Sequence, residues 1–163
     1  MSSYFKQLKS IVMKKFKTIF TAVAMLFAIS AFATDPVKVM PKVKASFEND
    51  FSKASQVIWE KTSDFYFASF TLNNVRVDAA YNEEGQLVGT SRRISLEQLP
   101  LNISMALAEK YEGYQLNESV VELTYEGLTR YYVNAENKDQ VLKLKCYGNA
   151  DIEVDQKFKK IKS

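Results

Sequence analysis

Hydrophobic residues recur every four positions in two short stretches of the chain, and each stretch predicts a short helix. The recurring positions are Val43, Phe47 and Phe51 in the first stretch and Ile103, Leu107 and Tyr111 in the second. Pro41 and Pro100 precede the two stretches and suit the first turn of a helix. Gly113 is a stop signal after the second, and Ser95 with Gln98 predicts a capping box just before it.

Four short segments rich in Val, Tyr, Phe and Thr follow each predicted helix, and turn residues separate them. This pattern is typical of antiparallel strands. The predicted strands are 56–61, 65–72, 75–82 and 86–94 in the first half and 116–125, 129–135, 140–147 and 151–158 in the second. The order therefore predicts an α+β fold made of a tandem repeat, one helix and four strands used twice, over about 41–94 and 100–158. The alternative is that two unrelated halves look alike by chance, since few residues are identical between them.

The turn Asn73-Asn74 sets the register of the first hairpin, because Asn accepts the left-handed positions of a two-residue type I′ turn. The predicted pairs are Leu72 with Val75, Phe70 with Val77, Ala68 with Ala79 and Tyr66 with Tyr81. That face is apolar and should lie under the helices, with Trp59 on the same side. The opposite face would carry Phe65, Phe67, Ser69, Thr71, Arg76, Asp78 and Ala80, with Ile58 beside Phe67.

In the second half of the chain, the faces of the strands can likewise be predicted by counting residues outward from the turns. A turn at Asn137-Lys138 would pair Val133 with Leu142 and Tyr131 with Leu144 under the helix. The residues that then fall on the free face are Arg130, Tyr132, Lys143 and Lys145. We expect odd-length loops at Glu126-Gly127 and after Gly85, because that parity buries Leu87, Val121 and Leu123. They add to the free face Val120, Glu122, Thr124, Val88 and Arg92.

One sheet surface should thus present aromatic side chains interleaved with cations. The candidate partner-binding residues are Phe65, Phe67, Arg76, Arg92, Arg130, Tyr132, Lys143 and Lys145. Aromatic and Arg side chains supply much of the energy of protein interfaces, and contiguous exposed apolar area is uncommon in monomers. Two alternatives explain Phe65 and Phe67 without a binding partner. Either residues 34–40 cover both side chains in the folded protein, or the predicted register is wrong by one residue. A small-molecule or cell-wall ligand, with Arg76 and Arg92 holding anions, is the alternative function.

An export signal accounts for the start of the chain. A basic stretch after Met13 leads into about fourteen apolar residues that end on Ala31-Phe32-Ala33. A membrane-spanning helix needs about twenty such residues, so we expect cleavage between Ala33 and Thr34. The prediction is a signal peptide over 1–33, with Met13 as the true start, and one periplasmic or secreted domain over 34–163 with no stable membrane insertion.

Removal of that signal changes the charge of the protein. Five of the 22 basic residues and none of the 19 acidic ones precede residue 34, so the exported part carries 17 basic and 19 acidic residues, a net charge of −2. The positive charge of the whole chain, +3, is then no argument for a nucleic-acid partner. We expect an unknown protein partner instead.

The absence of histidine argues against an enzyme. With no His in the chain, Ser-His-Asp and Cys-His nucleophile pairs and His-containing metal sites are excluded, and we expect no metal and no cofactor. Carboxylate catalysis stays open, but the pair Glu83-Glu84 lies in a predicted turn. Cys146, the single cysteine, alternates with Leu142 and Leu144 and is read as a small buried residue, an intermolecular or redox role being the alternative.

Several of these features together resemble the small PepSY-like, beta-lactamase-inhibitor-protein-like (BLIP-like) domains of Gram-negative envelopes. The resemblance covers essentially the whole chain after the signal. It rests on Val57-x-Trp59, on the turn and strand from Asn82 through Gly85 and Gly89, on Leu99-Pro100 and on the strand that ends at Cys146. It implies tandem α-β repeats, one curved antiparallel sheet with helices on a single side, and an open sheet face that holds a protein partner, perhaps an enzyme that it inhibits. No inhibitory contact residue carries over.

Overall fold

The computed structural model describes residues 37–161, which form an α+β fold with a nine-stranded sheet. The predicted signal peptide and its cleavage point lie outside the described residues. The helices are α2 (Pro41–Asp50) and α3 (Leu101–Lys110), with a short 3-10 helix η1 (Leu96–Gln98) before α3. The strands are β1 (Ser55–Lys61), β2 (Phe65–Leu72), β3 (Val75–Asn82), β4 (Leu87–Ser95), β5 (Gln115–Leu116), β6 (Ser119–Tyr125), β7 (Leu128–Glu136), β8 (Gln140–Tyr147) and β9 (Ile152–Lys159).

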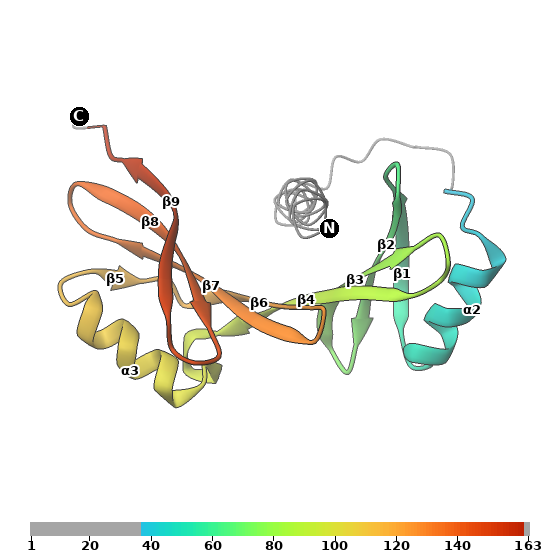
Figure 1. Cartoon of the computed structure of the whole chain (residues 1–163), viewed down its shortest axis with the longest axis horizontal. Coiled ribbons are helices and arrows are strands. Elements are labelled where there is room, and N and C mark those ends of the chain that lie inside the picture. Colours follow the sequence, from blue (N-terminus) through green and yellow to red (C-terminus); the bar gives the residue numbers. More distant parts are fainter. Residues whose placement is uncertain (1–36, 162–163) are drawn as a thin grey trace, which may run out of the picture. The chain divides into compact units, whose positions relative to one another are not determined.

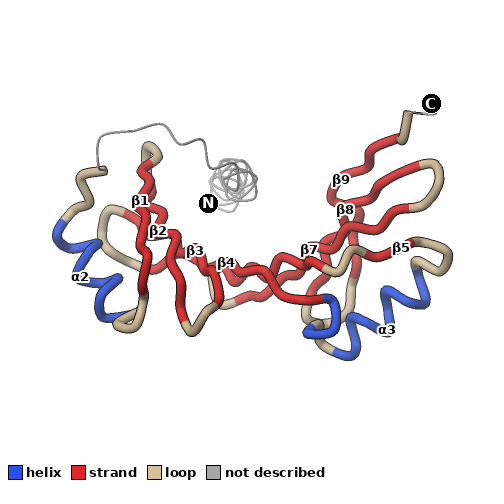
Figure 2. The backbone as a smooth tube through the Cα atoms, turned by 180° about the vertical axis from the view of Figure 1, so that it is seen from behind, coloured by secondary structure: helices blue, strands red, loops and turns tan. Residues whose placement is uncertain are grey.

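The sheet is antiparallel throughout, in the order β1-β2-β3-β4-β6-β7-β8-β9, and β5 pairs with β7. Figures 1 and 2 show that it is curved and that α2 and α3 lie on the same outer side, one near each end. The predicted single sheet with helices on one face is therefore confirmed. We call the opposite, inner side the helix-free face.

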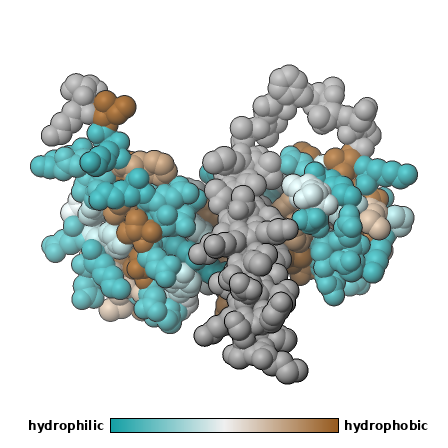
Figure 3. Space-filling view, turned by 45° about the horizontal axis from the view of Figure 1, so that its top comes forward, coloured by the Kyte–Doolittle hydropathy of each residue, from teal (hydrophilic) through white to brown (hydrophobic). Residues whose placement is uncertain are grey.

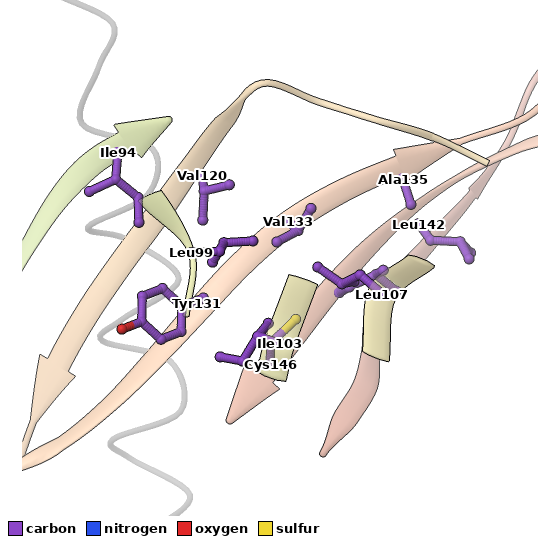
Figure 4. Close-up of a cluster of buried hydrophobic side chains, with 11 residues drawn as sticks. Ile94, Leu99, Ile103, Leu107, Val120, Tyr131, Val133, Ala135, Leu142 and Cys146 are labelled. Atoms are coloured by element: carbon purple, nitrogen blue, oxygen red, sulfur yellow. The ribbon is translucent and has the colours of Figure 1, made fainter. Parts of the chain in front are cut away.

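Each helix covers its own hydrophobic cluster. The stripe residues Val43 and Phe47 of α2 pack on Tyr66 and Phe70 of strand β2 and on Tyr81 of strand β3. On the other half, the stripe residues of α3 pack on side chains from strands β4, β6, β7 and β8 (Figure 4). The members drawn and labelled there are Ile94, Leu99, Ile103, Leu107, Val120, Tyr131, Val133, Ala135, Leu142 and Cys146. The two predicted helical stripes are thus the contacts that attach the helices to the sheet.

Local signals gave the first hairpin and the second helix start correctly. Asn73 and Asn74 both have positive φ, 49° and 64°, and the four predicted pairs from Leu72–Val75 to Tyr66–Tyr81 are the observed ones. Trp59 pairs with Ala68 and packs against the α2 cluster, as predicted. The capping box predicted at Ser95 and Gln98 is also present. Ile58 is on the helix-free face, although it lies opposite Ser69 rather than Phe67.

The loop at Glu126-Gly127 is even, which corrects the prediction for strand β6. Both residues adopt positive φ, 51° and 73°, and Tyr125 pairs directly with Leu128 across a two-residue turn. Because one residue of register turns every side chain to the other face, three residues predicted on the helix-free face lie on the helix side. These are Val120, Glu122 and Thr124. Val121 and Leu123 take their places on the helix-free face.

A β-bulge at Val88 corrects the prediction for strand β4. The loop after Gly85 is odd, as predicted, since Tyr81 pairs with Leu87, but Ala80 pairs with Gly89 and leaves Val88 as an extra residue. A bulge of this kind shifts the register by one. Arg92 consequently lies opposite Val77 on the helix side, and the prediction that it lies on the free face is wrong. Leu87, expected to be buried, is exposed.

The hairpin of β7 and β8 has the predicted faces but a different register. Val133 pairs with Leu144 and Tyr131 with Cys146, two residues away from the predicted partners. The reason is that the turn lies one residue later than predicted, at Lys138-Asp139, since Glu136 pairs with Val141 and the Asn137 N–H donates to the carbonyl oxygen of Gln140. In this loop the side chain of Asn137 accepts hydrogen bonds from the backbone N–H groups of Asp139 and Gln140. A shift of two preserves parity, so each side chain stays on its predicted face.

Candidate functional site

The helix-free face carries seven of the eight candidate residues. Phe65, Phe67 and Arg76 come from strands β2 and β3, and Arg130, Tyr132, Lys143 and Lys145 come from strands β7 and β8. Between these two groups lie the central strands β4 and β6, which contribute Gly89, Ser91, Arg93, Val121, Leu123 and Tyr125. Described hydrophobic residues appear in Figure 3 as separate spots on a mostly hydrophilic surface.

Phe65 and Phe67 form a close pair on this face. Their ring centroids lie 6.5 Å apart, and their side chains are only 9% and 5% exposed. Neither belongs to the cluster under α2. The alternative that residues 34–40 cover them is not supported by the described part of that segment, because Val39 packs on the α2 cluster, on the other side of the sheet. Residues 34–36 lie outside the described residues.

A buried band continues from the Phe pair across the middle of the face. Ala80, Ser91 and Leu123 are 6%, 8% and 6% exposed, and all three lie on the helix-free side. The pairings connect them, since Phe67 lies opposite Ala80 and Ser91 lies opposite Leu123. Their burial is not supplied by α2 or α3, and the band is distinct from both helix-covered clusters.

Five side chains at the other end of the face form what we call the cation–tyrosine patch. They are Arg130, Tyr132, Lys143, Lys145 and Tyr147. Tyr147 lies opposite Arg130, and Tyr132 lies opposite Lys145. The ammonium of Lys143 stands 5.4 Å from the centroid of the Tyr132 ring, and that of Lys145 stands 4.9 Å from the Tyr147 ring. Cation–π contacts at these distances hold each charge against an aromatic face.

The surroundings of Lys145 in the patch keep this side chain charged. Burial lowers the pKa of Lys145, but a hydrogen bond with Tyr147 and the proximity of that hydroxyl raise it, and the net shift is upward. Burial raises the pKa of Tyr132. Tyr147 also donates a hydrogen bond of 2.7 Å from its hydroxyl to Glu153 Oε2. At neutral pH the patch therefore presents the ammonium of Lys145 beside the neutral phenol of Tyr132.

Arg92 is engaged on the opposite side of the sheet. Its Nε lies 2.6 Å from Glu122 Oε1, directly across the β4–β6 pair, and this hydrogen bond raises the pKa of the guanidinium. Its neighbour Arg93 lies on the helix-free face instead, opposite Val121. The bulge at Val88 is what exchanges the two arginines.

Among the aromatic and cationic residues of the face, sequence reasoning missed Arg93, Tyr125 and Tyr147. Tyr147 could have been predicted from the sequence, because Tyr147 continues the alternation of Lys143 and Lys145 along the same strand. Arg93 could not have been predicted, because nothing in the local sequence marks the extra residue at Val88.

Two further residues of the helix-free face lie on strand β3. Asp78 accepts a hydrogen bond from Ser69 Oγ, and Arg76 is exposed.

A metal-binding cluster is not found in the part of the chain that the structure describes. Within residues 37–161 no group of three or more Cys, Asp or Glu side chains is arranged to hold a metal ion. No described helix is long and apolar enough to cross a membrane. Glu83 and Glu84 are both exposed in the turn after β3, and Glu83 pairs with Lys61 at 3.2 Å.

Cys146 is buried beneath α3, and we expect its thiol to be unreactive in the native protein. It is 0% exposed, and burial raises its pKa to about 11. Because the thiolate is the reactive form, modification by a disulfide reagent at pH 8 should be at least about a hundredfold slower than in unfolded protein. The rates with and without denaturant measure this. Comparable rates would mean that the thiol is accessible, and they would favour the alternative that Cys146 has an intermolecular or redox role.

Comparisons with known proteins give the fold alone. A scan against protein-family models finds no match, and neither does a search of curated proteins. Among solved structures, a DUF2874 family protein from Bacteroides uniformis is 15% identical, with a TM-score of 0.64 over 75% of this chain and 90% of that one. A BLIP-like protein from Bacteroides fragilis is 16% identical, with a TM-score of 0.63 over 76% of this chain and 87% of that one.

A third similar structure, from Bacteroides eggerthii, belongs to a protein inferred to be periplasmic. It is 12% identical, with a TM-score of 0.63 over 76% of this chain and 90% of that one. These likenesses support the BLIP-like fold expected from the sequence.

Proposed function

We propose that this chain is a non-enzymatic, exported binding module that holds a protein partner on its helix-free face. The observation that carries the proposal is the composition of that face. Aromatic rings and cations gather there, from Phe65 and Phe67 at one end to Tyr132 and Lys145 at the other, outside both hydrophobic clusters that the helices cover. A solvated antiparallel sheet face normally alternates to small polar side chains, whereas this composition is typical of protein interfaces.

The similar structures support this proposal at a coarser level. One is a BLIP-like protein, and another is inferred to be periplasmic. Inhibition of an enzyme partner, the PepSY-like kinship and the origin of the two halves as a tandem repeat are parts of the same proposal. So are export by a signal peptide over 1–33, cleavage between Ala33 and Thr34, and a single domain over 34–163. The order of a helix followed by strands, used twice, supports the repeat.

Three glutamate substitutions test the function. Ile58 on β1 and Tyr132 on β7 lie at the two ends of the helix-free face, and Ile58 is 54% exposed. The control is Leu101→Glu on α3, which is 75% exposed on the other side of the sheet. We expect a partner captured from envelope extract by the wild type to be retained by the control. A buried charge at an interface core costs binding at least about tenfold, so Ile58→Glu and Tyr132→Glu should lose that partner.

Two results would count against the proposal. If all four proteins capture the same set of partners, the helix-free face is not the binding surface. If instead cell-wall fragments or small anions raise the melting temperature, and Tyr132→Glu abolishes that rise, the ligand-binding alternative holds. Circular dichroism and melting temperatures of the variants would separate loss of binding from loss of fold.

A further inference from the structure

The three cations of the cation–tyrosine patch lack carboxylate partners within the described chain. None of the three takes part in the ion pairs that join Lys44 to Glu48, Lys61 to Glu83, Arg92 to Glu122 and Lys160 to Glu136 among the described residues. The acidic residues nearest the patch come from β9. Glu153 lies opposite Lys145 but accepts its hydrogen bond from Tyr147, and Asp155, which acts on Tyr132 through its charge, is exposed.

Arg130 carries a second, independent sign of an absent ligand. Its Nε is buried and has no hydrogen-bond partner. Buried polar atoms in folded proteins are nearly always hydrogen-bonded, and a guanidinium donor is among the most costly to leave unmatched. The fork of a guanidinium suits a carboxylate, which can accept two parallel hydrogen bonds. An acceptor from outside the described chain would satisfy this atom.

We propose that the cation–tyrosine patch binds an acidic segment of the protein partner, with a carboxylate accepting from Arg130 Nε and further carboxylates facing Lys143 and Lys145. This inference rests on the proposed function and names the chemistry of the partner. Charge complementarity supports it, because the exported protein as a whole has a net charge of −2 whereas this part of its surface concentrates cations. Tyr132 and Tyr147 provide ring faces for the apolar side chains between the acidic ones.

The spacing of the cations favours an extended peptide as the ligand. Lys143 and Lys145 are two residues apart on β8, which places them about 7 Å apart along one face of the strand. In an extended peptide, side chains two positions apart have the same spacing and direction. Arg130 lies on the neighbouring strand, where it pairs with Tyr147 beyond Lys145. An Asp or Glu at every second position of the partner segment would therefore meet the cations in turn.

A lipid surface fits this patch less well than a peptide does. Arg130, Tyr132, Lys143, Lys145 and Tyr147 are all half-buried on the inner side of a curved sheet. A bilayer attracts cations that project from a flat or convex surface within reach of its headgroups. A peptide segment is narrow enough to bind on the inner side of the curved sheet. We therefore assign the patch to an acidic protein segment.

The test selects random twelve-residue peptides displayed on phage against the purified protein and measures the selected peptides by fluorescence anisotropy. We expect the selected sequences to be rich in Asp and Glu. Their Asn and Gln counterparts should bind at least about tenfold more weakly. The double variant Lys143→Glu with Lys145→Glu should weaken the acidic peptides by about tenfold to a hundredfold, and Lys143→Arg should retain them. The control Lys110→Glu, on the exposed last turn of α3, should change affinity less than about twofold.

Several results would overturn the inference. It fails if selection yields neutral or basic peptides, yields none, or yields acidic peptides that ignore the double reversal. It also fails if vesicles of phosphatidylglycerol bind the protein more tightly than the peptides do and the double variant abolishes that binding. Should the double variant melt early, Arg130→Gln, which removes the charge and the Nε donor without introducing an acidic group, replaces it. If Ile58→Glu and Tyr132→Glu still abolish partner capture while the lysine reversals do not, the proposed function stands and only the acidic partner is wrong.

Discussion

Phe47→Ala is expected to lower the free energy of unfolding by about 3–5 kcal/mol. The ring of Phe47 is the centre of an aromatic cluster that attaches α2 to the sheet. Its centroid lies 5.0 Å from that of Phe70, 5.1 Å from Trp59 and 5.6 Å from Phe51. Its side chain is 5% exposed. Removal of this ring leaves a cavity between the helix and strands β1 to β3.

Helix α2 depends on tertiary packing of this kind, because its own sequence gives it little independent stability. It is ten residues long, and its N-cap, Met40, makes no side-chain hydrogen bond. Isolated helices of this length are marginal in water, so packing must stabilise it. Only Val43 and Phe47 of the helix are buried. A loss of about 3–5 kcal/mol is a large share of the roughly 5–15 kcal/mol by which small proteins are stable.

The matched control makes the same substitution on a surface strand. Phe158 on β9 is 55% exposed, and Phe158→Ala should cost less than about 1 kcal/mol. Urea unfolding followed by circular dichroism gives both free energies. Equal losses in the two variants, or a loss below about 1 kcal/mol for Phe47→Ala, would show that α2 is not held through this ring.

Elements of this fold could be predicted where the deciding chemistry lies within a few residues. Asn73 and Asn74 both accept positive φ, so the first hairpin and all its pairs follow from two side chains. The helical stripes follow from spacing alone, because each helix meets the sheet along one line of side chains. The faces of strands β7 and β8 were correct for a different reason. The turn after Asn137 lies one residue later than predicted, which shifts the pairing by two residues and leaves parity unchanged.

The middle of the sheet could not be predicted because its register depends on choices that the local sequence leaves open. Glu126 adopts a positive φ of 51°, which is uncommon for a residue with a long side chain. The bulge at Val88 adds one residue to β4. Both features turn strands by one position, and they account for the misplacement of Arg92 and Val120.

The prediction that Leu87 and Leu123 are buried under a helix is also wrong. Leu87 is exposed, and Leu123 is buried on the helix-free face. Burial therefore does not identify the helix side in this protein, because both faces of the sheet carry buried residues. The patch on β7 and β8 escaped this error, and the candidate residues there are those that the proposed function relies on most.

A second substitution, Gly85→Ala, is expected to cost about 2–4 kcal/mol, because two independent effects add. Gly85 has a φ of +74°, a conformation in which a Cβ is strained, typically by about 1–2 kcal/mol. A Cβ placed there would also stand 2.9 Å from Ser46 Oγ and 3.2 Å from the carbonyl oxygen of Lys42. Both atoms belong to α2, so the turn after β3 packs directly on this helix.

Gly127→Ala separates the two effects. Gly127 has nearly the same backbone conformation, with φ of +73°, but a Cβ there would meet nothing within 4 Å. Its cost should be the conformational strain alone, about 1–2 kcal/mol. The difference between the two variants in urea unfolding then measures the contact between the turn and α2. Equal losses in the free energy of unfolding would mean that the atoms of α2 near Gly85 move aside easily, and that this contact does not position the helix.

Removal of the Ser46 hydroxyl gives the complementary measurement. In the Gly85→Ala background, Ser46→Ala deletes the nearest atom, Oγ, while the backbone of Lys42 stays in place. We expect this double variant to regain part of the lost stability, whereas Ser46→Ala alone should change it by less than about 0.5 kcal/mol. Additive effects of the two substitutions would contradict the steric explanation. A regain of stability would show that two contacts position α2. One is the ring of Phe47, and the other is the fit of the loop at Gly85 against the first two helical turns of α2.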